Sequence, residues 1–167
     1  MAGELNEILP EPISDANAEV IQELLRRKVM GAARVSVRLL RAMEERFGPE
    51  AREVIDDMIG KLKPNPRPDA GDPQQDLATF AERLERGCAG SHRWEVVAKE
   101  PDRAAYHFTW CIWADVYRAL GEPELGFLHC AGDEPNVKSW NPKLGFRRSK
   151  VLMRGDNICD HQFVVEK

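Results

Sequence analysis

The hydrophobic pattern of this 167-residue chain changes its period once, slightly past the middle of the sequence. Before that point apolar residues recur at the three- to four-residue spacing of amphipathic helices. After it, Trp94, Val96 and Ala98 alternate with Glu95 and Lys99, as in a strand with one buried face. Helices followed by strands predict an α+β fold, in which N-terminal helices pack on a mainly antiparallel sheet of about four strands.

Three segments of the first half have helical periodicity: residues 17–47, 49–62 and 74–86. Gly31 could kink or break the first of them, so two or three helices are expected before residue 63. Gly48-Pro49 should end the first helix and start the second, and Gly87 should cap the third. The proline-rich run 63–73 fits neither helix nor strand, and it is interpreted as a surface connector, with a lid as the alternative.

The second half is expected to contain strands at 92–100 and 104–109, a helix at 110–120, and strands at 144–152 and 157–166. The segment 124–143 between them is expected to be irregular. The last two strands should form a hairpin that turns at residues 153–156. Helices are expected to cover one side of the resulting sheet.

The composition, with 43% hydrophobic and 31% charged residues, is typical of one globular domain over residues 1–167. We expect a flexible or loosely docked lead at 1–16, a helical part at 17–87 and a sheet part at 88–167. The net charge of −4 argues against a nucleic-acid partner. No apolar stretch reaches the roughly 18 to 20 residues that span a bilayer, and no secretory signal is visible. The chain is therefore expected to be cytoplasmic, without a membrane partner and with reduced cysteines.

The run GDNICDHQF near the C-terminus combines a thiol, a carboxylate and an imidazole. On a strand, Cys159 and His161 face one side and Asp160 the other. A thiol beside an imidazole can lose its proton and become a nucleophilic thiolate. The alternative, and the commoner situation, is that Cys159 is a small buried residue and His161 a core histidine.

Two further cysteines, Cys111 and Cys130, lie between residue 111 and this run. Cys111 is expected on the helix 110–120, on the same face as Asp115. Cys130 and Asp133 fall in the irregular segment, where a turn would present the carboxylate. Together with His161 the cysteines could bind zinc, but CxxC and HxxxH spacings are missing, so neither a metal nor a cofactor is predicted.

Four elements of the second half occur in a characteristic order: Cys111, LHCAGD at 128–133, NPKLGFRRSK at 141–150 and GDNICDHQF at 155–163. Over roughly residues 90–167 they resemble the L-2-amino-thiazoline-4-carboxylic acid hydrolase family. The resemblance implies a hydrolase acting on a non-peptide C–N bond of a small cyclic amidine or related heterocycle. The namesake of that family converts aminothiazoline carboxylate to N-carbamoyl-cysteine.

The resemblance and the required chemistry together give a set of candidate residues. The predicted catalytic residues are Cys159, His161, Cys111, Cys130 and Asp133. Either a thiolate attacks the amidine carbon, or Asp133 positions a water that does so. Arg148 and Lys150, expected on the penultimate strand, could bind a substrate carboxylate together with Asn141.

Two other functions remain open at this level. The same pocket could serve a ring-forming or rearranging biosynthetic enzyme, or a domain that binds a small molecule without turnover. In each case the partner is a small molecule, and the chain could form a homo-oligomer.

Overall fold

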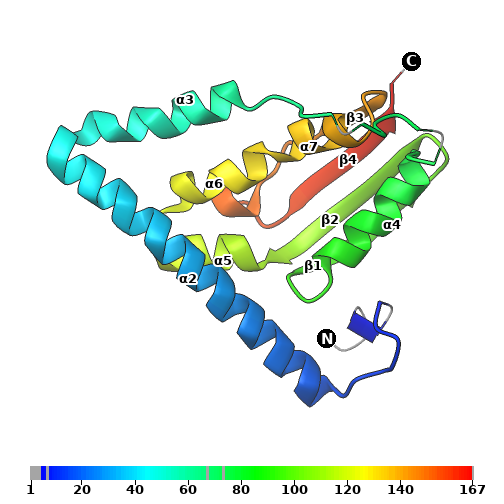
Figure 1. Ribbon diagram of the computed structural model, residues 1–167. Helices are drawn as coiled ribbons and strands as arrows, with labels where there is room; N and C mark the ends of the chain where they lie inside the picture. The colour runs from blue at the N-terminus through cyan, green and yellow to red at the C-terminus, as the bar shows by residue number, and fades with distance from the viewer. Residues whose placement is uncertain (1–4, 7, 67, 73, 167) are drawn as a thin grey trace.

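The computed structural model describes residues 5–6, 8–66, 68–72 and 74–166 (Figure 1). Its main elements are, in chain order, α2 (Asp15–Phe47), a 3₁₀ turn (Pro49–Arg52), α3 (Glu53–Lys61), α4 (Leu77–Cys88), β1 (His92–Lys99), β2 (Arg103–Cys111), α5 (Ile112–Ala119), α6 (Pro123–Ala131), α7 (Asp133–Trp140), β3 (Leu144–Arg147), a second 3₁₀ turn (Leu152–Arg154) and β4 (Cys159–Val165). The predicted α+β class is confirmed.

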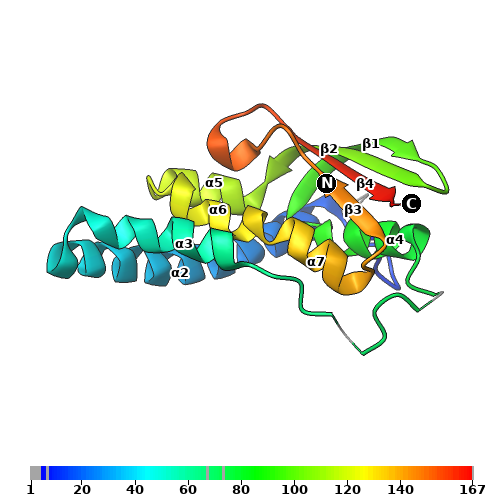
Figure 2. The same cartoon turned by 90° about the horizontal axis from the view of Figure 1, so that it is seen from above.

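The four strands form one sheet in the order β1-β2-β4-β3, and every neighbouring pair is antiparallel. The prediction of a single antiparallel sheet is therefore confirmed. Strand β4 lies between β2 and β3, which are separated along the chain by three helices. Helices α4 and α7 lie on the same face of this sheet (Figure 2).

The central strands direct two kinds of side chain to opposite faces of the sheet. Across β2 and β4, Phe108 lies opposite Cys159 and Tyr106 opposite His161, on the face that the helices cover. His107 and Asp160 pair on the other face. Because the side-chain period of a strand is two, this register alone separates Cys159 and His161 from the carboxylate between them.

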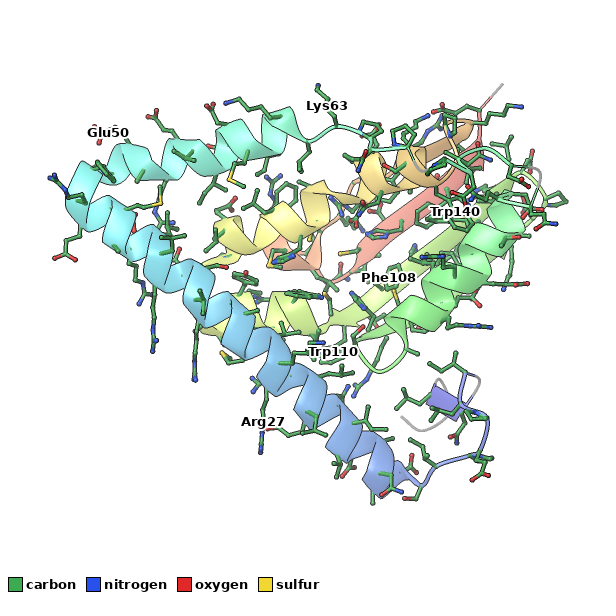
Figure 3. All side chains as sticks on the ribbon, in the orientation of Figure 1. Arg27, Glu50, Lys63, Phe108, Trp110 and Trp140 are labelled. Carbon is green, nitrogen blue, oxygen red and sulfur yellow. The ribbon has the colours of Figure 1, made fainter. Side chains whose placement is uncertain are left out.

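Helix α2 is continuous, and Gly31 does not interrupt it. One face is buried at helical spacing, through Ala18, Val29, Ala33, Val37 and Leu40. A glycine costs a helix only about 1 kcal/mol relative to alanine, which this packed face offsets. The opposite side is solvated, and Arg27 points away from the molecule there (Figure 3).

Helix α4 starts at an Asp76 cap, whose carboxylate accepts the Thr79 backbone N–H at 2.8 Å. It continues through Gly87 to Cys88, so the prediction that Gly87 caps it at residue 86 is wrong. The extra residues place Cys88 on the helix, above the sheet.

The segment predicted to be irregular, 124–143, instead contains most of α6 and all of α7. Its prolines do not prevent helix formation, because Pro123 occupies the first position of α6 and Pro135 lies in the first turn of α7. In the first turn the backbone N–H groups have no intrahelical acceptor, so proline is tolerated. Asp133 is therefore presented by a helix N-terminus and not by a tight turn.

Several strand boundaries also differ from the prediction. Strand β2 extends to Cys111, so the helix expected from residue 110 begins at Ile112, and Cys111 does not share a helical face with Asp115. Strand β3 ends at Arg147, which puts both Arg148 and Lys150 beyond it. The strands β3 and β4 pair as expected, but the connection between them is longer than a hairpin turn and contains the second 3₁₀ turn.

Two segments outside the regular elements pack on the body. In the lead, Leu5 is buried and the side chain of Asn6 donates to and accepts from the Ile13 backbone, so its described part is docked. In the connector, Asn65 N–H donates to Ser139 Oγ at 2.7 Å. Residues 67 and 73 of that connector and residues 1–4 and 7 of the lead lie outside the described residues. Within the described chain, no helix has the length and apolarity needed to cross a membrane.

Candidate active site

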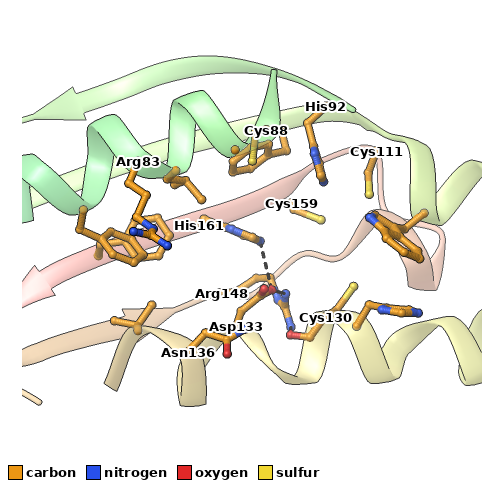
Figure 4. A pocket seen from close by; sticks show the side chains of 18 residues that line it. Arg83, Cys88, His92, Cys111, Cys130, Asp133, Asn136, Arg148, Cys159 and His161 are labelled. Carbon is orange, nitrogen blue, oxygen red and sulfur yellow. Dashed lines mark hydrogen bonds and ion pairs between the residues drawn. The ribbon is translucent and has the colours of Figure 1, made fainter. Parts of the chain in front are cut away.

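A cavity of about 460 Å³ lies between α4, the covered face of the sheet, and helices α6 and α7 (Figure 4). Its volume is in the range of small-molecule sites. All five predicted catalytic residues line it: Cys111, Cys130, Asp133, Cys159 and His161. These residues span almost fifty positions, and the fold brings them to one place because β2 and β4 are paired beneath α6 and α7.

The predicted substrate-binding residues divide into one that lines the cavity and two that do not. Arg148 lines it, directly after β3. Lys150 is exposed, and its backbone N–H donates to Asp160 at 2.6 Å. Asn141 is buried, with Nδ2 donating to the Gln75 carbonyl at 2.8 Å, and it lies outside the lining of this cavity. Asn141 therefore connects two backbone segments beside α7.

Arg148 is held by the residues around it. Its Nη1 donates to Asp133 Oδ2 at 2.6 Å, and its Nη2 donates to the Cys130 carbonyl at 3.2 Å. The guanidinium also lies 5.4 Å from the centre of the Phe146 ring. Only 9% of the Arg148 side chain is exposed, so this arginine is committed to orienting Asp133.

The imidazole of His161 faces the same carboxylate from the sheet. Its Nε2 lies 3.9 Å from Asp133 Oδ2, and this buried atom has no hydrogen-bond partner among the described residues (Figure 4). The rings of Phe108 and Phe146 pack against it at 4.9 and 5.0 Å. Aromatic packing thus fixes the ring while its polar edge faces Asp133 across a short gap.

Burial sets the charges in this cluster. It raises the pKa of Asp133 to about 6, although the Arg148 guanidinium opposes the shift. It lowers the pKa of His161 to about 3, with a further contribution from Arg148, and that of His92 to about 4. At neutral pH the cavity therefore holds an ionised carboxylate beside neutral imidazoles.

The four cysteines of the chain are free thiols, and all four line the cavity. Burial raises the pKa of Cys88 and Cys130 to about 12 and that of Cys111 to about 11. Burial also raises the pKa of Cys159. The backbone N–H of Leu152 donates to its Sγ at 3.1 Å, and this hydrogen bond lowers the pKa by less than burial raises it. All four thiols are therefore protonated at neutral pH, and neutral His161 offers Cys159 no positive charge to form an ion pair.

Five polar or titratable cavity residues were not identified as site residues from the sequence: Arg83, Cys88, His92, His129 and Asn136. Cys88 follows the apolar face of α4 at helical spacing, a signal that could have placed it inward. His129 stacks on Trp113, with ring centres 4.2 Å apart. Arg83 and His92 carry no comparable signal, because their orientation depends on how α4 and β1 pack on the other strands.

No metal-binding arrangement of three or more His, Cys, Asp or Glu side chains occurs within the described part of the chain.

Comparison with known proteins gives one match. A family model described as L-2-amino-thiazoline-4-carboxylic acid hydrolase matches residues 26–163, which is most of the chain. The matched range includes Asp133, Arg148 and His161. Neither the search of curated proteins nor the search of solved structures found a match.

Proposed function

Because this chain belongs to the L-2-amino-thiazoline-4-carboxylic acid hydrolase family, we propose that it hydrolyses a small cyclic amidine or related heterocycle. In this proposal water adds to the amidine carbon and the ring opens. Asp133 is the general base, His161 assists through Nε2, and Arg148 positions Asp133. The cysteines form a wall of the cavity and do not act as nucleophiles.

The observation that carries the proposal is the gap between His161 Nε2 and Asp133 Oδ2. At 3.9 Å the two atoms are too far apart to bond each other, yet both can reach one oxygen at about 2.8 Å. A water held there would have a base on one side and an imidazole on the other. The unpartnered, buried state of Nε2 supports such a ligand, because a buried polar atom without a partner costs free energy.

The protonation states suit this reaction. A carboxyl group with a pKa of about 6 is ionised at neutral pH, and it is a stronger base than an ordinary aspartate. A neutral imidazole can donate an N–H to a lone pair of the attacking oxygen and so hold that oxygen in position for attack. Direct attack by a thiolate is less favourable, since burial keeps each cavity thiol in its neutral form.

Asp133 takes one proton from water as the oxygen bonds to the amidine carbon, and it returns that proton to the ring heteroatom that leaves. The second water proton moves from the added oxygen to the nitrogen that was doubly bonded to this carbon, and the carbonyl of the product forms. In an aminothiazoline opened to a carbamoyl-cysteine, both nitrogens stay on the carbon, so the C–S bond breaks. If the leaving ring heteroatom is nitrogen, the same steps break a C–N bond, as the family resemblance implies.

The test is to incubate the purified chain with a panel of cyclic amidines that differ in ring heteroatom, and to follow the products by mass spectrometry. The expected result is a product heavier by one water, formed by the wild-type chain and not by Asp133→Asn. Binding of every panel member without any product would overturn hydrolysis in favour of a binding domain. An isomeric product with no added water would indicate a rearranging enzyme.

A further inference from the structure

We propose that Arg83, on α4 at the rim of the cavity, binds a carboxylate of the substrate, with Asn136 on α7 as a second donor. The inference rests on the proposed function and extends it, because it identifies the residues that select a substrate bearing a carboxylate. It also replaces Arg148, Lys150 and Asn141 as the carboxylate-binding residues.

The cavity offers few positive charges. Among its lining residues the arginines are Arg83 and Arg148, and the lining histidines whose pKa values burial lowers, such as His161, are neutral. Arg148 already donates to Asp133 and to the Cys130 carbonyl. A substrate carboxylate bound by Arg148 would compete with Asp133, the proposed base. A substrate anion needs another cation.

Arg83 meets that need. Its guanidinium lies over the Trp140 ring, 5.1 Å from the ring centre, and no carboxylate of the described chain pairs with it. Stacking on an aromatic face fixes the guanidinium plane but leaves its N–H edge available for a planar carboxylate. The side chain extends from α4 toward the side of the cavity that α7 forms (Figure 4). The residue is exposed, so an anion could reach it from solvent.

Asn136 completes the subsite from the other side. It lies three positions after Asp133 on α7 and lines the same cavity. Residues three apart are neighbours on a helix surface, so its amide lies next to the proposed base. A substrate held at the rim by Arg83 and Asn136 would direct its ring inward, toward Asp133 and His161.

The size of the effect follows from the kind of contact. A hydrogen bond to a charged group contributes about 1.5 to 3 kcal/mol, or roughly 10- to 100-fold in an equilibrium constant. Arg83→Gln should therefore raise KM about 10- to 100-fold for a substrate with a carboxylate. It should leave kcat within about threefold, because Arg83 does not touch the reacting atoms.

The experiment uses the full chain and a matched pair of probes, 2-aminothiazoline-4-carboxylate and 2-aminothiazoline. Turnover and binding are measured for the wild type, Arg83→Gln, Arg83→Lys and the control Arg86→Gln. Arg86 is exposed on the same helix and does not line the cavity. Binding is followed by tryptophan fluorescence, since Trp113 lines the cavity and Trp140 lies under Arg83.

The expected result is that wild type and Arg86→Gln prefer the carboxylate probe, that Arg83→Gln loses this preference, and that Arg83→Lys recovers part of it. Equal effects of Arg83→Gln on both probes, or no effect on either, would overturn the proposal. The binding arm separates the two proposals. Carboxylate-dependent binding that is lost in Arg83→Gln but never leads to product would support the subsite and refute hydrolysis of these probes. Turnover of the carboxylate probe that Arg83→Gln leaves unchanged would support hydrolysis and refute the subsite.

Discussion

The cavity has two sides that differ in whether a counter-charge opposes the effect of burial. On one side Asp133 and Arg148 form a charged pair that His161 faces across a short gap. The other side is lined by thiols, represented by Cys111 and Cys159. Desolvation favours the neutral forms of Asp133, His161 and the thiols. Only the charged side contains a partner that preserves ionisation at neutral pH.

This difference decides which side can perform chemistry. Arg148 limits the rise in the pKa of Asp133 to about 6, so the carboxylate remains a base. The thiols have no such counter-charge close enough to offset burial, and their pKa values rise above the ordinary range. A carboxylate paired with an arginine therefore indicates the reactive group more reliably than four cysteines around the same cavity do.

The largest expected effect is on the charged side. Asp133→Asn keeps the shape but removes the base, so kcat should fall by about 10²- to 10⁴-fold, the usual contribution of general base catalysis. The measurement is steady-state kinetics on a cyclic amidine that the wild type hydrolyses. Glu134→Gln is the matched control, because Glu134 is the next residue of α7, exposed and outside the cavity lining. An Asp133→Asn variant with near-normal kcat would move the chemistry to the thiol side.

A smaller loss is expected when the imidazole is removed. His161→Phe should lower kcat by up to roughly tenfold, since it deletes one neutral hydrogen bond to the reacting oxygen, worth about 0.5 to 1.5 kcal/mol. Thermal stability should stay equal or increase, because the ring sits among aromatic side chains and its buried Nε2 has no partner among the described residues. Kinetics and a melting curve on the same preparation check both statements. A strongly destabilised variant with unchanged kcat would make His161 a structural residue.

The smallest effect is expected on the thiol side. Cys159→Ser should retain kcat within about threefold and lose about 1 to 2 kcal/mol of unfolding free energy, because a hydroxyl replaces a buried sulfur. Kinetics and denaturant unfolding are the measurements, with Cys88→Ser as a second thiol variant from α4. Complete loss of turnover in Cys159→Ser, with stability unchanged, would restore the thiolate alternative.

Much of the fold was accessible from the sequence because hydrophobic periodicity reports local burial. The pattern predicted the helices before residue 63, the four strands and their antiparallel pairing. It failed where an apolar face was short and prolines were frequent, as in α6 and α7. There the expected turn at Asp133 is replaced by the start of α7, whose first turn holds Pro135, because the first turn of a helix tolerates proline.

The site was accessible only in part. The order of the four motifs along the chain identified the five catalytic candidates and Arg148, all of which line the cavity. The roles proposed above depend on distances and burial that no spacing encodes. The commitment of Arg148 to Asp133 and the stacking of Arg83 on Trp140 are contacts between separate elements. Cys159 and His161 do share a strand face, but burial leaves both neutral, which their spacing could not reveal.

The pH dependence of kcat/KM tests most directly whether the carboxylate or a thiol is the reactive group. If Asp133 must be ionised, kcat/KM should fall about tenfold per pH unit below pH 6 and stay level above pH 7. Because the folded pKa of His161 is about 3, no second limb should appear near pH 6.5. Cys159→Ser should give the same profile as the wild type. A wild-type kcat/KM that continues to rise above pH 8, and a Cys159→Ser variant that loses this rise, would contradict the account.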